Sequence, residues 1–149
     1  MRRSRFIALI IIALVLAACG GPPPDTTVSA PPKATALEHS DNAKINEYID
    51  RLKADAPATM KDQGIKDTAE QPIEQQVYQS TASLQEVADF YKALTQHGWT
   101  EANNMPILKD GVLLDGYQIS NTTLVVNAVE QAKLGGESGV VIYTVKGTK

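Results

Sequence analysis

Residues 83–99 read SLQEVADFYKALTQHGW, and this stretch predicts the best-defined helix of the chain. Ser83 and Glu86 match a capping box, in which each side chain accepts a hydrogen bond from the backbone N–H of the other residue. Apolar side chains then recur every three or four residues, as one buried helix face requires, at Leu84, Val87, Ala88, Tyr91 and Leu94. Gly98 follows, and glycine readily takes the left-handed conformation that ends a helix. We therefore expect a helix at 84–97.

Strand patterns lie on both sides of this helix. Residues 73–80 precede it, and a short, interrupted strand at 99–108 follows it. Three further strands, separated by turn sequences, are expected at 112–120, 122–131 and 139–146. A strand, a helix and then several strands are typical of an α+β domain. The sequence therefore predicts an antiparallel sheet of about four to five strands with the 84–97 helix packed on it.

A second, N-terminal helix is expected at 41–53, with Ser40 or Asp41 as its cap. Its apolar side chains share one face because they are three or four residues apart, at Ile45, Tyr48, Ile49 and Leu52. Residues 54–71 include Pro57 and show little periodicity, so we expect an irregular connection there.

The last two strands are apolar on both faces, and one helix cannot cover both. Leu124 and Val126 point to one face, whereas Val125 and Val129 point to the other. Burial of an apolar side chain contributes about 1.5–3 kcal/mol, so a bare apolar face would be costly. Either the 41–53 helix covers the second face, which we favour, or that face is left for a protein partner.

The chain begins MRRSRFIALIIIALVLAACG, which has the pattern of a secretory signal. Arg2, Arg3 and Arg5 form a basic start, and residues 6–18 form an uncharged, mostly aliphatic run. A relaxed transmembrane helix needs about 20 apolar residues, and this run is shorter. We therefore expect a signal peptide that is removed, and not a retained membrane helix.

The end of this run, Leu16-Ala17-Ala18-Cys19, resembles the lipobox of bacterial lipoproteins at all four positions. The resemblance implies transfer of diacylglycerol to the Cys19 thiol, cleavage between Ala18 and Cys19, and often acylation of the new amino group, for example with palmitate. Two or more acyl chains hold a protein firmly to a bilayer, whereas one chain holds it only marginally. The alternative is a secreted protein whose lone cysteine happens to lie at the cleavage site.

Residues 83–99 are also similar to a small domain of uncharacterised bacterial lipoproteins. In that domain a helix with a Phe-Tyr pair ends in Gly-Trp and leads into a short antiparallel sheet. Phe90-Tyr91 and Gly98-Trp99 carry the resemblance, which covers about residues 73–146. The resemblance implies the α+β fold and supplies no activity.

These features predict a lipoprotein signal peptide at 1–18, a proline-rich flexible tether at 19–40 and a single α+β domain at 41–149. Proline-rich segments extend by about 3.1 Å per residue, so the tether would hold the domain up to roughly 60 Å from a bilayer. Without the three arginines of the signal, the chain has 11 basic and 17 acidic residues, a net charge of −6, which argues against a nucleic-acid partner. Cys19 is the only cysteine, so no disulfide can form within the chain.

No motif predicts catalysis, a metal site or a cofactor. The stretch Gly136-Glu137-Ser138-Gly139 is one residue short of the G-x-S-x-G pattern of a nucleophilic serine. His39 and His97 have no histidine or cysteine at the spacing of metal ligands. Asp110 and Asp115 flank a turn, and we expect them to be solvated carboxylates and not calcium ligands.

We therefore expect a lipid-anchored, non-catalytic binding or protein-interaction module on the extracytoplasmic side of the cell membrane, or on the outer membrane of a double-membrane cell. Its expected partners are the membrane, through the lipid on Cys19, and a protein, if a sheet face is left bare. The alternatives are an envelope enzyme with an unrecognised carboxylate site and a structural accessory subunit of a membrane complex.

Overall fold

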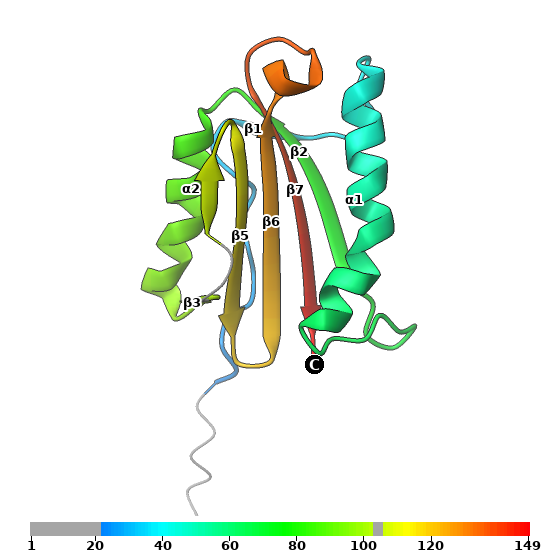
Figure 1. Ribbon diagram of the computed structural model, residues 1–149. Helices are drawn as coiled ribbons and strands as arrows, with labels where there is room; N and C mark the ends of the chain where they lie inside the picture. The colour runs from blue at the N-terminus through cyan, green and yellow to red at the C-terminus, as the bar shows by residue number, and fades with distance from the viewer. Residues whose placement is uncertain (1–21, 103–105) are drawn as a thin grey trace, which may run out of the picture.

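The computed structural model describes residues 22–102 and 106–149, which form an antiparallel sheet with a helix against each face (Figure 1). The strands are β1 Ala34–Ala36, β2 Glu74–Ser80, β3 Thr100–Glu101, β4 Ile107–Lys109, β5 Val112–Ile119, β6 Thr122–Glu130 and β7 Val140–Thr148. Their order is β1-β2-β7-β6-β5-β3, and β4 also pairs with β5. The mixed α and β character is as predicted. The estimate of four to five strands is wrong, because β1 adds an edge strand and 99–108 supplies two short strands.

The predictions about the anchor lie outside the described residues. These predictions concern the signal peptide at 1–18, the cleavage between Ala18 and Cys19, and the lipid on Cys19, and the structure does not describe these residues. Within the part of the chain that the structure describes, no helix has the length and apolar character to cross a bilayer.

The capped helix forms as the sequence predicts. α2 spans Leu84–Lys92 and continues as a 3₁₀ turn, η1, over Ala93–His97. The N–H of Ser83 donates to Oε2 of Glu86 at 2.8 Å, and the N–H of Glu86 donates to Oγ of Ser83 at 3.2 Å. Gly98 has a φ of 88°, so the left-handed residue that ends the helix is the expected one.

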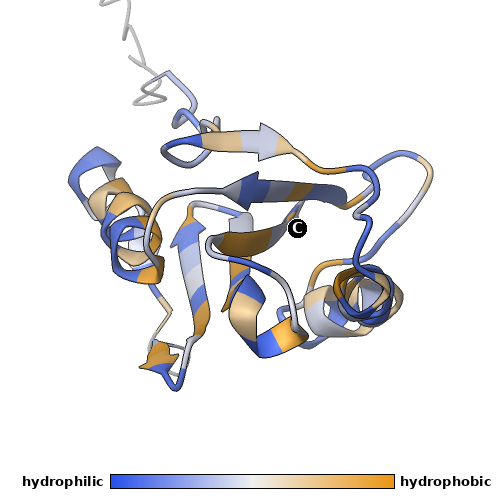
Figure 2. Cartoon of the chain, turned by 90° about the horizontal axis from the view of Figure 1, so that it is seen from above, coloured by the Kyte–Doolittle hydropathy of each residue, from blue (hydrophilic) through white to orange (hydrophobic). Residues whose placement is uncertain are grey.

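The two helices cover opposite faces of the sheet, as Figure 2 shows from above. On one face, α2 and the strands bury a cluster that includes Val87, Tyr91, Leu124, Val126 and Ile142. On the other face, α1 (Ala43–Asp62) and the strands bury a cluster that includes Ile45, Ile49, Met60, Val125, Val129 and Tyr143. The expectation that the N-terminal helix covers the second face is therefore confirmed. Alternation along β6 sends neighbouring side chains into different cores, which makes the domain three layers thick.

The cap of α1 differs from the expected one. Asn42, and not Ser40 or Asp41, precedes the helix, and its side chain accepts from the N–H of Lys44 at 2.9 Å. Oγ of Ser40 accepts from the N–H of Asn42 at 3.2 Å and so supports the cap. All three residue types are good caps, so the local sequence does not choose between them.

α1 is also longer than the predicted helix at 41–53, because it runs through Pro57 to Asp62. The irregular connection expected at 54–71 is therefore wrong for its first part. A proline inside a helix costs about 3 kcal/mol or more. The buried stripe continues past it, since Ala56 and Met60 are almost fully buried, and this packing offsets the cost.

Much of the segment expected as a flexible tether at 19–40 lies against the domain. We call residues 25–33 the strap. Val28 packs against the cluster on the α2 face, and Oγ of Ser80 donates to the carbonyl of Pro32 at 2.7 Å. The chain then enters β1, which pairs with β2. Contacts with the domain hold this polar segment in place, and the composition of the segment itself does not predict these contacts.

The predicted turns on either side of β5 are two-residue hairpins. Asp110 and Gly111 have φ values of 53° and 75°, which suit the tight turn between β4 and β5. In the turn between β5 and β6 the left-handed residue is Ser120, with a φ of 51°. A 3₁₀ turn, η2 (Gln131–Leu134), follows β6.

Candidate functional site

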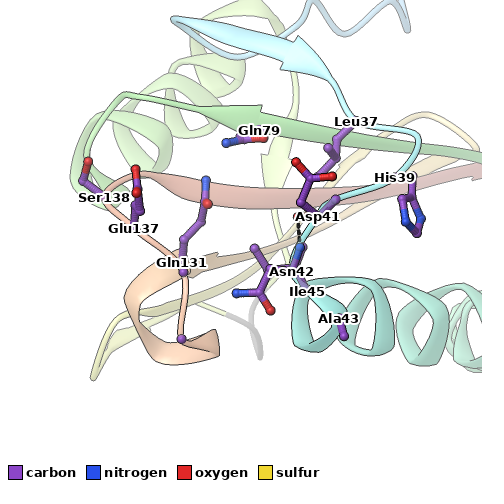
Figure 3. A pocket seen from close by; sticks show the side chains of 13 residues that line it. Leu37, His39, Asp41, Asn42, Ala43, Ile45, Gln79, Gln131, Glu137 and Ser138 are labelled. Atoms are coloured by element: carbon purple, nitrogen blue, oxygen red, sulfur yellow. Dashed lines mark hydrogen bonds between the residues drawn. The ribbon is translucent and has the colours of Figure 1, made fainter.

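A polar cavity of about 840 Å³ lies at the end of the sheet where α1 begins (Figure 3). Its walls come from residues 37–45, Gln79 of β2, Gln131 directly after β6, and residues 135–138 before β7. These segments are far apart in the sequence, and the pairing of β2, β7 and β6 brings them to one edge. We call this space the Gln131 cavity.

Gln131 is the buried polar residue of this cavity. Its side chain is 5% exposed, and its Nε2 is the one buried side-chain nitrogen or oxygen of the described residues that has no hydrogen-bond partner. Figure 3 shows its amide extending into the cavity, with Asp41, Gln79 and Glu137 around it. An unpaired buried donor costs about 1–3 kcal/mol. The wall of the cavity therefore contains a buried donor that no described residue pairs with.

The main chain holds Gln131 in place. Its N–H donates to the carbonyl of Gly139 at 2.9 Å, and its carbonyl accepts from the N–H of Gly136 at 2.9 Å. A Cβ at Gly139, where φ is 121°, would lie 2.7 Å from the carbonyl oxygen of Ser80 and 3.1 Å from Nε2 of Gln131. Glycine at this position therefore leaves room for the amide.

Two acidic side chains stand at the rim. Asp41 and Glu137 are exposed, and neither belongs to an ion pair within the described residues. Lys44 reaches the edge of the same region, with its Nζ 4.0 Å from the place that a Cβ of Gly135 would occupy. The rim thus offers hydrogen-bond acceptors, whereas the buried end offers a donor.

Side-chain amides stiffen the wall that leads into α1. Oδ1 of Asn46 accepts from the N–H of Ser40 at 2.8 Å, and its Nδ2 donates to the carbonyl of Ser40 at 2.7 Å. Nδ2 of Asn42 donates to the carbonyl of Leu134 at 3.2 Å, which ties the start of the helix to η2. His39 lies on this wall, 3.5 Å from Nδ2 of Asn46 through its Nε2. These contacts shape this wall of the cavity.

The structure separates the two histidines that the sequence analysis considered. His39 lines the Gln131 cavity, together with Glu137 and Ser138 of the incomplete serine motif. His97 lies in a second cavity of about 410 Å³, beside Trp99 at the end of η1. Within residues 22–102 and 106–149, no group of three or more His, Cys, Asp or Glu side chains is placed to hold a metal ion.

The two aspartates near the β4–β5 turn have different surroundings. Asp110 is exposed, as expected, and Nζ of Lys109 lies 3.9 Å from its Oδ2. The expectation that Asp115 is solvated is wrong, because only 5% of it is exposed. Asp115 lies well inside β5, on the same face as the buried Leu113 and Tyr117, so strand alternation turns it inward.

Three large apolar side chains are exposed among the described residues, and they gather at the β4–β5 turn. They are Ile107, Leu108 and Val112. Because α1 and α2 cover the middle of the two sheet faces, this turn, and not a bare sheet face, carries the exposed large apolar side chains of the described residues.

No motif points to Gln131, but its position contains a signal. Val125 and Val129 of β6 point toward α1, and Gln131 continues that alternation just past the strand. A polar residue where the pattern expects burial is informative.

The chemistry of the cavity follows from its geometry. A fixed, buried donor and exposed carboxylates surround a space that can hold a small molecule. Neither a protein-family model, nor a curated protein, nor a solved structure matches this chain.

Proposed function

We propose that this protein is a lipid-anchored, extracytoplasmic binding module without catalytic activity, and that it holds a small polar ligand in the Gln131 cavity. The observation that carries the binding role is the buried Nε2 of Gln131, which has no hydrogen-bond partner among the described residues and belongs to a side chain that lines the cavity. The anchor is supported by the basic start, the apolar run and the Leu16-Ala17-Ala18-Cys19 motif.

The path of the strap supports this arrangement. Nζ of Lys146, near the end of β7, donates to the carbonyl of Thr26 at 3.4 Å, whereas the cavity lies where β7 begins. In Figure 1 the blue start of the strap lies at the end of the sheet that also holds the C-terminus and the β5–β6 turn. The strap therefore starts at the end of the domain opposite the cavity.

The length of the chain before the strap limits the distance to the membrane. Six residue steps separate Cys19 from Asp25, and an extended chain spans at most about 3.6 Å per residue. A lipid on Cys19 would hold this end of the domain within about 20 Å of the bilayer, and not at the roughly 60 Å that a free tether would allow. The Gln131 cavity would then face away from the membrane.

Mass spectrometry of the mature N-terminus, from protein isolated with its native membrane, tests the anchor. We expect residues 1–18 to be absent and Cys19 to carry a diacylglyceryl group. Cys19→Ala should remain unprocessed and should incorporate no labelled fatty acid. An unmodified amino end at another residue would contradict the anchor.

The binding role is tested with Gln131→Met, which keeps the length of the side chain and removes its polar amide. Because the unpaired donor is lost, we expect the free energy of unfolding to rise by about 1 kcal/mol. Small polar compounds that raise the melting temperature of the wild type should have no effect on this variant. If such compounds stabilise both proteins equally, they do not bind at Gln131 and the proposal is wrong.

A further inference from the structure

We infer that the ligand of the Gln131 cavity is an amino compound in which a primary ammonium group lies three bonds from a carbonyl or hydroxyl oxygen. This inference rests on the proposed binding role and adds the chemical class of the ligand. Amino-acid amides, peptide amino ends and amino alcohols share this chemistry.

The buried end of the cavity requires an oxygen from the ligand. Nε2 of Gln131 is an amide nitrogen, which donates hydrogen bonds and accepts none. The main-chain bonds of Gln131 to Gly136 and Gly139 hold the backbone from which this side chain extends. A carbonyl or hydroxyl oxygen pairs with it, whereas an ammonium group alone leaves it unsatisfied.

The rim favours a cation. Asp41 and Glu137 come from opposite walls of the cavity, and an ionised carboxylate only accepts hydrogen bonds. Neither has an ion-pair partner within the described residues, and the mature chain carries a net charge of −6, so the surroundings disfavour an anion. His39 is the basic side chain of the lining, and Lys44 lies at its edge, where its Nζ is 4.0 Å from the place that a Cβ of Gly135 would occupy.

The lining also distinguishes between kinds of cation. Proteins recognise quaternary ammonium groups with the faces of aromatic rings. None of the residues that line this cavity is Phe, Tyr or Trp. Carboxylate and amide oxygens instead suit the three N–H donors of a primary ammonium, and Gln79 can supply a third oxygen beside Asp41 and Glu137.

The test is a titration of the isotope-labelled, mature full-length protein in detergent micelles, followed by NMR. The probe is glycinamide, which combines an ammonium group with a carbonyl oxygen. Acetamide lacks the ammonium, propylamine lacks the oxygen, and trimethylglycinamide has a quaternary ammonium. We expect glycinamide to shift the side-chain amide resonances of Gln131 and to bind about tenfold more tightly than each of the other three.

Substitutions at the rim provide matched variants that keep the fold, because these side chains are exposed. Asp41→Asn and Glu137→Gln should each weaken glycinamide about two- to fivefold, as loss of an exposed ion pair predicts. Glu70→Gln removes an exposed carboxylate away from the cavity and should change nothing.

The outcomes separate the two proposals. If acetamide binds as tightly as glycinamide and also shifts Gln131, the cavity binds ligands but the amino class is wrong. If no probe shifts the resonances of Gln131 at any concentration that dissolves, the binding role of the cavity fails as well.

Discussion

The hydroxyl of Tyr117 donates a hydrogen bond to Oδ2 of Asp115, two residues earlier on the same face of β5, and both side chains are buried. Oδ1 of Asp115 accepts from the N–H of Gly116 at 2.8 Å. Within the described residues no cation pairs with this carboxylate. Two donors close to Asp115 in the sequence therefore satisfy its buried carboxylate. Burial of Tyr117, and then the neighbouring carboxylate of Asp115, raise the pKa of Tyr117 well above its usual value.

We predict that Tyr117→Phe lowers the free energy of unfolding by about 1–3 kcal/mol, because one oxygen of the buried Asp115 loses its donor. Urea denaturation measures the change. Tyr48→Phe is the matched control, since Tyr48 is only partly buried and its hydroxyl makes no hydrogen bond to another described residue. Equal losses in the two variants would show that the Asp115 bond contributes nothing.

Buried tyrosines should make the domain sensitive to alkali. Burial raises the pKa of Tyr143 to about 12 and raises the pKa values of Tyr91 and Tyr117 as well. In the unfolded chain tyrosine ionises near pH 10. Above that pH the folded state holds more protons than the unfolded state, so the free energy of unfolding falls as the pH rises from about 10 toward 12. Denaturation midpoints at pH 8, 10 and 11 should decline, while tyrosinate absorbance shows these rings resisting ionisation until unfolding. A flat profile would contradict the prediction.

The α2 cap should weaken in acid. The N–H of Ser83 and then Lys33 hold the pKa of Glu86 down, at about 2. The unfolded value is about 4.3, so the contribution of this carboxylate is fully present above that pH and is lost as the pH falls toward 2. Glu86→Gln should be less stable than the wild type at pH 7, and the gap should close at pH 2. A gap that stays constant with pH would rule out this carboxylate as its source.

The strap should resist proteolysis. Its carbonyls at Pro32 and Lys33 accept from Ser80 and Thr81, and β1 follows directly. Trypsin should therefore cut after Lys66, in the exposed connection between α1 and β2, well before it cuts after Lys33. Val28→Ser should speed the cut after Lys33 by removing apolar packing on the α2 face. Rapid cleavage after Lys33 in the wild type would mean that the segment is a free tether.

The proposed orientation on the membrane can be measured with single cysteines, since a lipidated Cys19 leaves no other thiol in the mature chain. Asn121→Cys places a label at the β5–β6 turn, and Ser138→Cys places one at the cavity. In vesicles that contain a lipid-attached quencher, the Asn121→Cys label should be quenched more strongly. Stronger quenching at Ser138→Cys would reverse the orientation.

Several elements could be predicted because their causes lie within a few residues. The Ser83–Glu86 cap defines the start of α2 and Gly98 the end of η1, and alternation along β6 assigns Val125 and Val126 to different cores. The end of α1 could not be predicted, because Pro57 opposes a helix locally and the packing of Met60 against the sheet favours one. The burial of Asp115 could not be predicted either, because its donor, Tyr117, is recognisable only when both residues lie in a strand against a core.

By itself the sequence determined the capped helix, the apolar pattern of the strands and the two-sided core, since hydrogen bonds and side-chain periodicity of short range encode them. Only the tertiary structure decided the path of the strap, which depends on contacts such as Pro32 with Ser80 and Thr26 with Lys146, 48 and 120 residues apart. It also decided the candidate site, because Asp41, Gln131 and Glu137 meet only when the pairing of β6 with β7 brings their segments to the start of α1. Contacts between residues so far apart in the sequence depend on how whole elements pack, and no local pattern in the chain specifies them.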